Sequence, residues 1–254
     1  MDDGSPLVQA LASIIAEGGD SAPLRICQAC VRELPVDGVA ITLMTDADHQ
    51  EPVCASDRVA SEIDELQFSL GEGPCWEVFG SGRPVLIPDL TDAVDDRWPM
   101  FSARVRRTMA RALYVFPVQL GAIRLGVLDL YSRTPGLLAP EQLGGALRAA
   151  DAALWTLLAT PTEDRQETGG APRWMPDQPL RRAEVHQATG MVVAQADVSA
   201  ETALAMLRAQ AFVDDRPIDQ VARDVVARRL RFALDVVNGM LVIPGSAATD
   251  EQTH

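Results

Sequence analysis

The sequence predicts an α+β protein in two parts: an antiparallel sheet with flanking helices over residues 6–158, and an all-α unit of three helices over residues 180–243. Apolar residues alternate with period two in the short strands of the first part and recur every three to four residues in the second. Between them, residues 159–179 hold six Pro and Gly residues among polar ones, which favours a linker. Residues 244–254 are small and polar, as is typical of a frayed tail.

The first part alternates helices with short strands. We predict helices over residues 6–17, 24–34, 61–68, 97–108 and 141–158, and strands over residues 39–43, 52–56, 85–87, 113–120 and 125–131. Gly121 and Ala122 join the last two strands as a hairpin, and residues 71–75 are expected to form a tight turn. Such a sheet should carry helices on one face and at its ends, with a pocket between the sheet and the helices that cross it.

The charge balance excludes several classes of function. All 22 basic residues are Arg, because the chain contains no Lys. This excludes Schiff-base catalysis, Lys-bound pyridoxal phosphate and a Walker-type phosphate loop. The net charge of −14 opposes binding of the whole protein to nucleic acid or anionic lipid, but it is uneven: residues 1–160 carry 22 acids and 12 Arg, whereas residues 173–243 carry nine of each. A polyanion would therefore meet the C-terminal third.

Catalytic and metal-binding patterns are weak in this sequence. The pair Cys27-x-x-Cys30 has half the spacing of a zinc site, but no second pair or nearby His completes it. We expect buried, reduced thiols there, with a metal, cluster or redox role as the alternative. None of the three His lies in a metal or triad spacing, so we predict neither a metal site nor an enzyme. No apolar run approaches the roughly 20 residues of a membrane span.

The first part contains Phe-Ser-Leu-Gly-Glu-Gly-Pro-Cys at 68–75, the segment 81–90, Arg-Trp-Pro at 97–99 and the paired strands that end at 125–131. In these motifs it resembles a GAF domain, a small-molecule sensor fold related to PAS. The resemblance implies that this part senses a small signal, and we take Cys54, Cys75 and Trp76 as candidate pocket residues. No bilin or haem ligand motif is evident, so the ligand and any cofactor stay unknown.

The second part contains Val-His-Gln-Ala-Thr-Gly-Met-Val-Val at 185–193, followed by the segments 199–208 and 217–222. In these segments it resembles an ANTAR domain, the three-helix RNA-binding output module of transcription antiterminators. One departure is Thr189, at a position where the family often has Lys. The resemblance implies a cytoplasmic regulator that binds paired hairpins in nascent transcripts. Paired hairpins suit a homodimer, in which helix 141–158 could pair with its mate through Ala149, Ala153, Trp155 and Leu157. The alternative is that this helix only covers the sheet.

Arginines near the helix ends are the main candidate RNA contacts, because guanidinium groups bind phosphate in a bidentate manner and stack on unpaired bases. The alternative is a solvated face on which these arginines pair with neighbouring aspartates. The candidate RNA-binding residues are Arg181, Arg182, Gln187, Thr189, Arg208, Arg223, Arg228, Arg229 and Arg231. The small residues Ala188, Gly190, Ala203 and Ala222 are taken as a structural motif. At Gly190 and its neighbours we expect close helix packing, with direct approach of an RNA backbone as the alternative.

Two functions fit these observations. The first is a signal-responsive, RNA-binding regulator of transcription antitermination. The second is a ligand- or redox-sensing module whose helical tail docks on another protein. Both lack a membrane partner, and capture of RNA by the chain distinguishes the first from the second.

Overall fold

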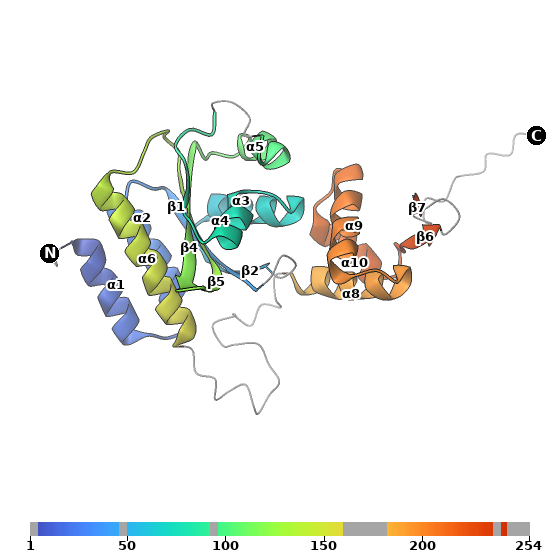
Figure 1. Cartoon of the computed structure of the whole chain (residues 1–254), viewed down its shortest axis with the longest axis horizontal. Helices are drawn as coiled ribbons and strands as arrows, with labels where there is room; N and C mark the ends of the chain where they lie inside the picture. The colour runs from blue at the N-terminus through green and yellow to red at the C-terminus, as the bar shows by residue number, and fades with distance from the viewer. Residues whose placement is uncertain (1–4, 46–49, 92–95, 160–181, 236–239, 243–254) are drawn as a thin grey trace, which may run out of the picture. The chain divides into compact units, whose positions relative to one another are not determined.

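The chain divides into two compact units, Met1–Pro179 and Leu180–His254, each of which is described by itself. The computed structural model describes residues 5–45, 50–91, 96–159, 182–235 and 240–242 (Figure 1). The predicted tail and, apart from Ala159, the predicted linker lie outside these residues.

Proline and glycine set the limits of the helices in the first unit. These helices are α1 (Pro6–Glu17), α2 (Ala22–Glu33), α3 (Arg58–Leu70), α4 (Pro74–Ser81), α5 (Pro99–Val105) and α6 (Pro140–Leu158). All except α3 have Pro in the first turn, where its missing N–H would have no helical partner anyway. Gly71 and Gly82 end α3 and α4 in the left-handed conformation. The tight turn predicted at residues 71–75 is therefore shorter than expected, since α4 begins within it.

The five strands form one antiparallel sheet in the order β2-β1-β5-β4-β3. They are β1 (Gly38–Met44), β2 (Gln50–Ala55), β3 (Val85–Ile87), β4 (Ala112–Leu120) and β5 (Ile123–Ser132). Leu120 pairs with Ile123, which confirms the hairpin predicted at Gly121 and Ala122. The antiparallel sheet with flanking helices is the architecture that the sequence predicted.

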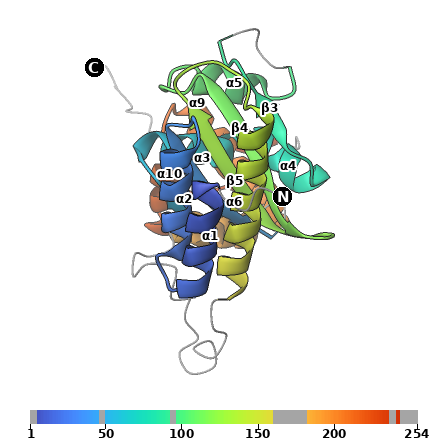
Figure 2. The same cartoon turned by 90° about the vertical axis from the view of Figure 1, so that its left-hand side faces the viewer.

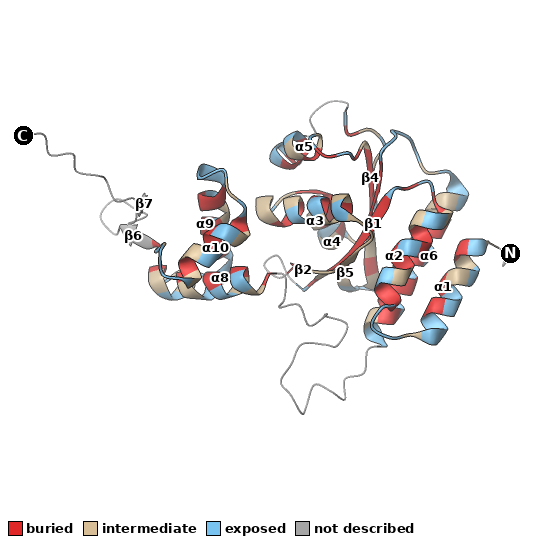
Figure 3. Ribbon diagram, turned by 180° about the vertical axis from the view of Figure 1, so that it is seen from behind, coloured by how far each residue is buried: buried red, intermediate tan, exposed pale blue. Residues whose placement is uncertain are grey.

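Helices cover both faces of this sheet, which corrects the expectation of one covered face. Helices α1, α2 and α6 lie on one side and α3, α4 and α5 on the other, with α1 packed against α2 and α6 (Figures 1 and 2). The reason is visible in β1 and in most of β4 and β5, where nearly every residue is buried (Figure 3). Such continuous apolar strands require cover on both faces. Alternate residues enter the two cores: Leu128 and Leu130 face α6, whereas Val127 and Tyr131 face α3.

Three helices pack on one another in the second unit: α8 (Ala183–Ala196), α9 (Ala200–Val213) and α10 (Ile218–Val226). The sequence predicts Ser199 as the N-cap of a helix over residues 200–212. Helix α9 confirms this, because the Ser199 hydroxyl accepts a hydrogen bond from the Thr202 N–H at 3.1 Å. The helical spacing of Ile218, Val221, Ala222, Val225, Val226 and Leu230 predicts a third helix as far as Leu230, but α10 ends at Val226. A short hairpin of β6 (Ala233–Asp235) and β7 (Met240–Val242), which the sequence did not predict, follows.

Gly126 allows β5 to approach β1 closely, and this makes a test of the sheet register. A Cβ atom at this position would lie 2.0 Å from the Thr42 carbonyl oxygen. We expect Gly126→Ala to lower the free energy of unfolding by about 1–3 kcal/mol, as overpacking does elsewhere. Gly136→Ala is the matched control, because a Cβ there has no heavy atom within 4 Å. Denaturant unfolding followed by circular dichroism measures both, and equal midpoints would contradict the register.

Candidate sensor pocket and RNA-binding surface

Polar side chains tie α3 to the sheet across an apolar interface. Asp57 caps α3, accepting from the Ala60 N–H at 2.8 Å, and also accepts from the Tyr131 hydroxyl of β5. About two turns further along α3, Asp64 accepts hydrogen bonds from the Thr42 hydroxyl of β1 at 2.6 Å and from the Gln50 amide of β2 at 3.2 Å. These contacts place one face of α3 over β2, β1 and β5.

The last of these contacts joins Gln67 of α3 to Asp129 of β5. The Gln67 Nε2 donates to Asp129 Oδ2 at 3.0 Å, and both side chains are buried. The other end of the same amide, Oε1, accepts from the Cys75 N–H of α4 at 2.8 Å, which fixes the orientation of the amide. The Gln67 carbonyl accepts from the Trp76 indole N–H at 3.1 Å. Gln67 thus links the sheet, α3 and the start of α4.

Asp129 is the most perturbed carboxyl of this site. Burial, reinforced by the nearby charge of Asp64, raises its pKa to about 8, although the hydrogen bond from Gln67 acts in the opposite direction. At pH 7 the carboxyl is therefore mostly protonated. Since Gln67 donates to Oδ2, the proton belongs on Oδ1, an atom with no hydrogen-bond partner among the residues that the structure describes.

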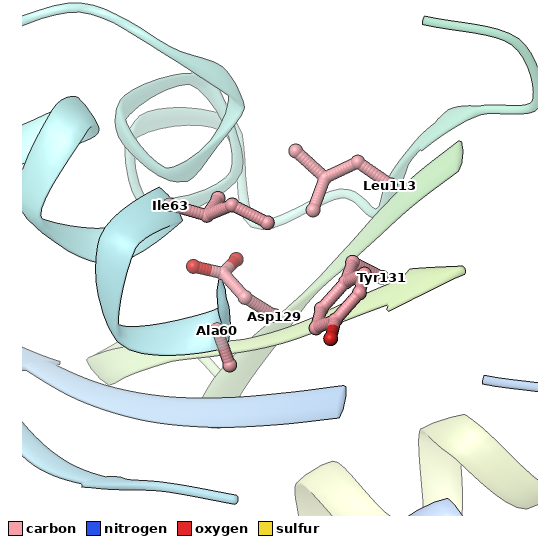
Figure 4. Close-up of a pocket in the computed structure, with 5 residues that line it drawn as sticks. All are labelled: Ala60, Ile63, Leu113, Asp129 and Tyr131. Carbon is pink, nitrogen blue, oxygen red and sulfur yellow. The ribbon is translucent and has the colours of Figure 1, made fainter. Parts of the chain in front are cut away.

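Asp129 points from β5 toward α3 in a small, mostly apolar pocket (Figure 4). The other lining residues are Ala60 and Ile63 of α3, Leu113 of β4 and Tyr131 of β5. The space between these residues, open solvent included, amounts to about 150 Å³, and none of it is wide enough to hold a water molecule. A ligand larger than water therefore enters only if the lining residues move apart.

The predicted pocket residues do not line this pocket. Cys54 lies on the opposite face of the sheet, packed against the core of α1, α2 and α6. Cys75 is buried between α3 and α4, and Trp76 is half-buried beside it, so both touch Gln67 rather than the cavity. Sequence reasoning missed Asp129, although a single acid within the apolar run of residues 127–131 was a usable signal.

The surface of the second unit carries arginines of two kinds. Arg223 forms ion pairs with Asp219 and, at 3.3 Å, with Glu184. Arg229 pairs with Asp224 at 2.6 Å, and Arg216 reaches the same carboxylate at 2.6 Å. Hydrogen bonds from these two arginines hold the pKa of Asp224 below its usual range.

Arg228 and Arg231 are the second kind: both are exposed, and neither has an acidic partner within the described part of the chain. Arg228 also has a left-handed backbone with φ 60°. Its N–H donates to the Val225 carbonyl at 2.9 Å, while the Arg229 N–H donates to the Asp224 carbonyl at 2.8 Å. This pair of bonds closes α10 in a Schellman motif, whose left-handed position is usually Gly.

The remaining predicted residues of this unit fall in different places. Arg181 lies outside the described residues, and Arg182 is buried at 2% exposure, so the expectation that it lies on an open face is not met. Arg208 is half-buried. Gln187 is exposed, and the Thr189 hydroxyl donates to the Val185 carbonyl at 2.8 Å.

The four small residues of the predicted structural motif differ in their burial. Ala188, Ala203 and Ala222 are fully buried between the helices. Gly190 is exposed, and a Cβ added to it would meet nothing within 4 Å. The expectation of close helix packing at Gly190 is therefore wrong, because this glycine lies on the outer face of α8.

Family models identify both units. The model of the GAF domain matches residues 24–161, which is more than half of the chain, and the model of the ANTAR domain matches residues 178–226. This chain is a GAF and ANTAR domain-containing protein. GAF domains are sensory and ANTAR domains belong to RNA-binding antitermination regulators, so the protein is of the regulatory kind.

Solved structures similar to the GAF domain come from several bacteria. An N-acylhomoserine lactone dependent LuxR family transcription factor from Burkholderia cenocepacia is 20% identical, with a TM-score of 0.49 over 61% of this chain and 96% of that one. The GAF domain of a phosphoenolpyruvate-protein phosphotransferase from Acinetobacter is 12% identical, with a TM-score of 0.47 over 59% of this chain and 92% of that one. The comparison with curated proteins found no match.

Two further observations bear on function. Within the described ranges, no group of three or more His, Cys, Asp or Glu side chains is arranged to hold a metal ion. Among the helices that the structure describes, none is both long enough and apolar enough to cross a membrane.

The raised pKa of Asp129 predicts a specific pH dependence of stability. Below about pH 4 the folded and unfolded chains both carry this proton; between about pH 4 and 8 only the unfolded chain releases it, so this group favours unfolding more as the pH rises. Asp129→Asn removes the effect. We expect its gain in unfolding free energy over the parent to grow by roughly 1.4 kcal/mol per pH unit in this window, as an upper value.

Denaturant unfolding of the parent and the variant at pH 5, 6, 7 and 8 measures this difference. Asp20→Asn, at an exposed loop position, is the control and should show a constant difference from the parent. A constant difference for Asp129→Asn as well would show that Asp129 ionises normally in the folded protein.

Proposed function

We propose that this protein is a signal-responsive RNA-binding regulator of transcription antitermination, acting in the cytoplasm where transcripts are made. In this proposal the ANTAR domain binds RNA hairpins and the GAF domain holds the small molecule that controls it. The match of both domain families in one chain is the observation that carries the proposal. The charge distribution supports it, because the arginines at the end of α10 lie in the part of the chain with no net negative charge.

In this proposal Arg228 and Arg231 are the most accessible contacts for RNA phosphates, because neither has to break an ion pair with a described acidic residue before it binds phosphate. Arg223 and Arg229 extend the same surface. Their ion pairs are half-exposed, and such pairs contribute only about 0–1 kcal/mol, so a phosphate group can replace Asp219 or Asp224 at little cost. Gln187 adds an exposed amide on α8.

The GAF pocket sets the chemistry of the signal. With Asp129 protonated, its free oxygen presents an O–H to a ligand, so the pocket suits a small, largely apolar molecule with one hydrogen-bond acceptor, such as a carbonyl. In this proposal its entry shifts α3, which is capped by Asp57 and carries Asp64 and Gln67. Binding is thereby coupled to the packing of α3 and α4.

The experiment that tests this function is crosslinking and sequencing of RNA bound to the full chain in cells, followed by titration of the recovered hairpin. Arg228→Gly is the decisive variant. Gly suits the left-handed position, so we expect stability to stay equal or rise by up to about 1 kcal/mol. RNA affinity should fall several-fold, and the dependence of log affinity on log salt should become shallower by about 0.7–1.

Asp197→Gly is the matched control. Asp197 is an exposed residue with φ 53° at the end of α8, so this change relieves a similar backbone conformation without removing a cation. RNA affinity should be retained. Recovery of no RNA at all would overturn the proposed function, whereas equal affinities of Arg228→Gly and the parent would remove Arg228 from the interface.

A protein-docking tail is the second candidate function, because Phe212 and Val213 expose large apolar side chains at the end of α9, at 54% and 76%. Phe212→Ser distinguishes the two. It should leave RNA binding intact in the first case and remove the captured protein in the second.

The proposed regulator acts as a homodimer through α6. Ala149 and Ala153 are buried against the sheet side, so they are not available to a mate as the sequence suggested. The opposite side of α6 exposes Leu147, Trp155 and Leu158 at 41–51%. These three residues form a stripe at helical spacing.

Light scattering after size exclusion checks this assembly. We expect a mass near twice 27.3 kDa for the parent and near 27.3 kDa for Trp155→Arg. Leu137→Arg, at an apolar loop position that is 73% exposed, should stay dimeric. A monomeric parent would contradict the dimer.

A further inference from the structure

Two cysteines meet at the edge of the sheet, on the face covered by α1, α2 and α6. The Cys27 Sγ of α2 lies 3.4 Å from the Cys54 Sγ of β2, a contact between thiols that are 27 residues apart in sequence. Cys27 is fully buried, whereas Cys54 is partly exposed. Cys30, also buried, lies one turn further along α2, and Cys75 belongs to the core on the opposite face of the sheet.

The backbone at Cys54 is suited to a small movement. Strand β2 is an edge strand, hydrogen-bonded only to β1 in the described sheet. Its register with β1 is irregular there: Cys54 pairs with Ile41 and Pro52 with Thr42, so Val53 is the extra residue of a bulge. A disulfide needs the sulfur atoms at about 2.05 Å, so they must approach by roughly 1.4 Å.

We propose that Cys27 and Cys54 form a disulfide when the protein meets a peroxide, which makes the contact between α2 and β2 an oxidation-sensitive site. Cys54 reacts first, since it is the partly exposed residue of the two, whereas Cys27 is fully buried. Its thiolate attacks one peroxide oxygen, the O–O bond breaks, and the hydroxide that leaves takes up a proton, so that Cys54 becomes a sulfenic acid. The Cys27 sulfur then attacks the Cys54 sulfur, the S–O bond breaks, and the departing hydroxide takes the Cys27 proton as water.

The burial of Cys27 fits the second role. Its hydrogen bond with the Cys54 thiol and its burial raise the pKa of Cys27 well above the ordinary value, so it does not compete for the peroxide. Burial also raises the pKa of Cys30 to about 12. The two sulfur atoms already in contact allow Cys27 to capture the sulfenic acid before a second oxidation.

The bond would act on the sensor pocket through the chain itself. Cys54 precedes Asp57, the cap of α3, by three residues, and Asp57 is bound to Tyr131, which lines the Asp129 pocket. Pulling Cys54 toward α2 therefore displaces the chain that leads directly into α3. This route does not depend on RNA binding.

Peptide mapping of the full chain tests the proposal. The protein is first reduced and then treated with hydrogen peroxide, and the thiols that remain free are blocked. Without further reduction it is then cut with trypsin, which cleaves only after Arg in this chain. Cys27 and Cys30 fall in the peptide 26–32, and Cys54 in the peptide 33–58. We expect an intact protein lighter by two hydrogen atoms and a linked pair of these two peptides.

Variants identify the partners and keep the test independent of folding defects. The link should persist in Cys30→Ser and Cys75→Ser and disappear in Cys54→Ser, a mild change at a partly exposed position, and in Cys27→Ser. Oxidation of the unfolded chain shows that the linked peptides are detectable. Absence of the link in the folded parent, a link that requires Cys30 instead of Cys27, or conversion of Cys54 to a sulfinic acid would overturn the proposal.

Discussion

Helix α3 lies on an apolar sheet but is held there by polar side chains, and the sensor unit depends on this attachment. A buried carboxyl must be hydrogen-bonded or neutral, because a charge without a partner is very costly away from water. Asp57 and Asp64 accept from hydroxyl and amide groups of the sheet, and Asp129 takes the other solution by keeping its proton. Because hydrogen bonds depend on direction and distance, they fix the position of α3 more narrowly than apolar packing alone would.

The same attachment connects parts of the molecule that lie far apart in sequence. Gln67 bonds Asp129 on the sheet and the first turn of α4, so a displacement of α3 reaches the glycine-rich turn that precedes α4. The chain runs from the edge strand β2 into α3 at Asp57, whereas Cys54 of β2 faces the core formed with α1, α2 and α6. Because successive residues of a strand face opposite sides, one strand transmits a change between two separate cores.

In the ANTAR domain, aspartates near α10 form ion pairs with some of the arginines and leave others without an acidic partner among the described residues. Asp224 alone binds Arg216 and Arg229, and Asp219 binds Arg223. These pairs reduce the positive charge that the three arginines present, at a modest energetic cost. The end of α10 departs from this pattern, since Arg228 occupies a position where backbone conformation favours Gly. Non-Gly residues with such sparsely populated backbone conformations cluster at functional sites of proteins.

Local patterns in the sequence determined most of the elements and both family resemblances. Helix α1, strand β3 and the hairpin at Gly121 were predicted at their observed places, because periodicity, Pro and Gly act within a few residues. Only the tertiary structure decided which residues are in contact. Gln67 and Asp129 are 62 residues apart in sequence, and Cys54 does not line the pocket but contacts Cys27 on the opposite face of the sheet. The tertiary structure also buried Arg182 and exposed Gly190. Strand register, the face toward which a side chain points and the cover on each face of a sheet are set by contacts between distant segments, and no pattern along a short stretch of chain contains them.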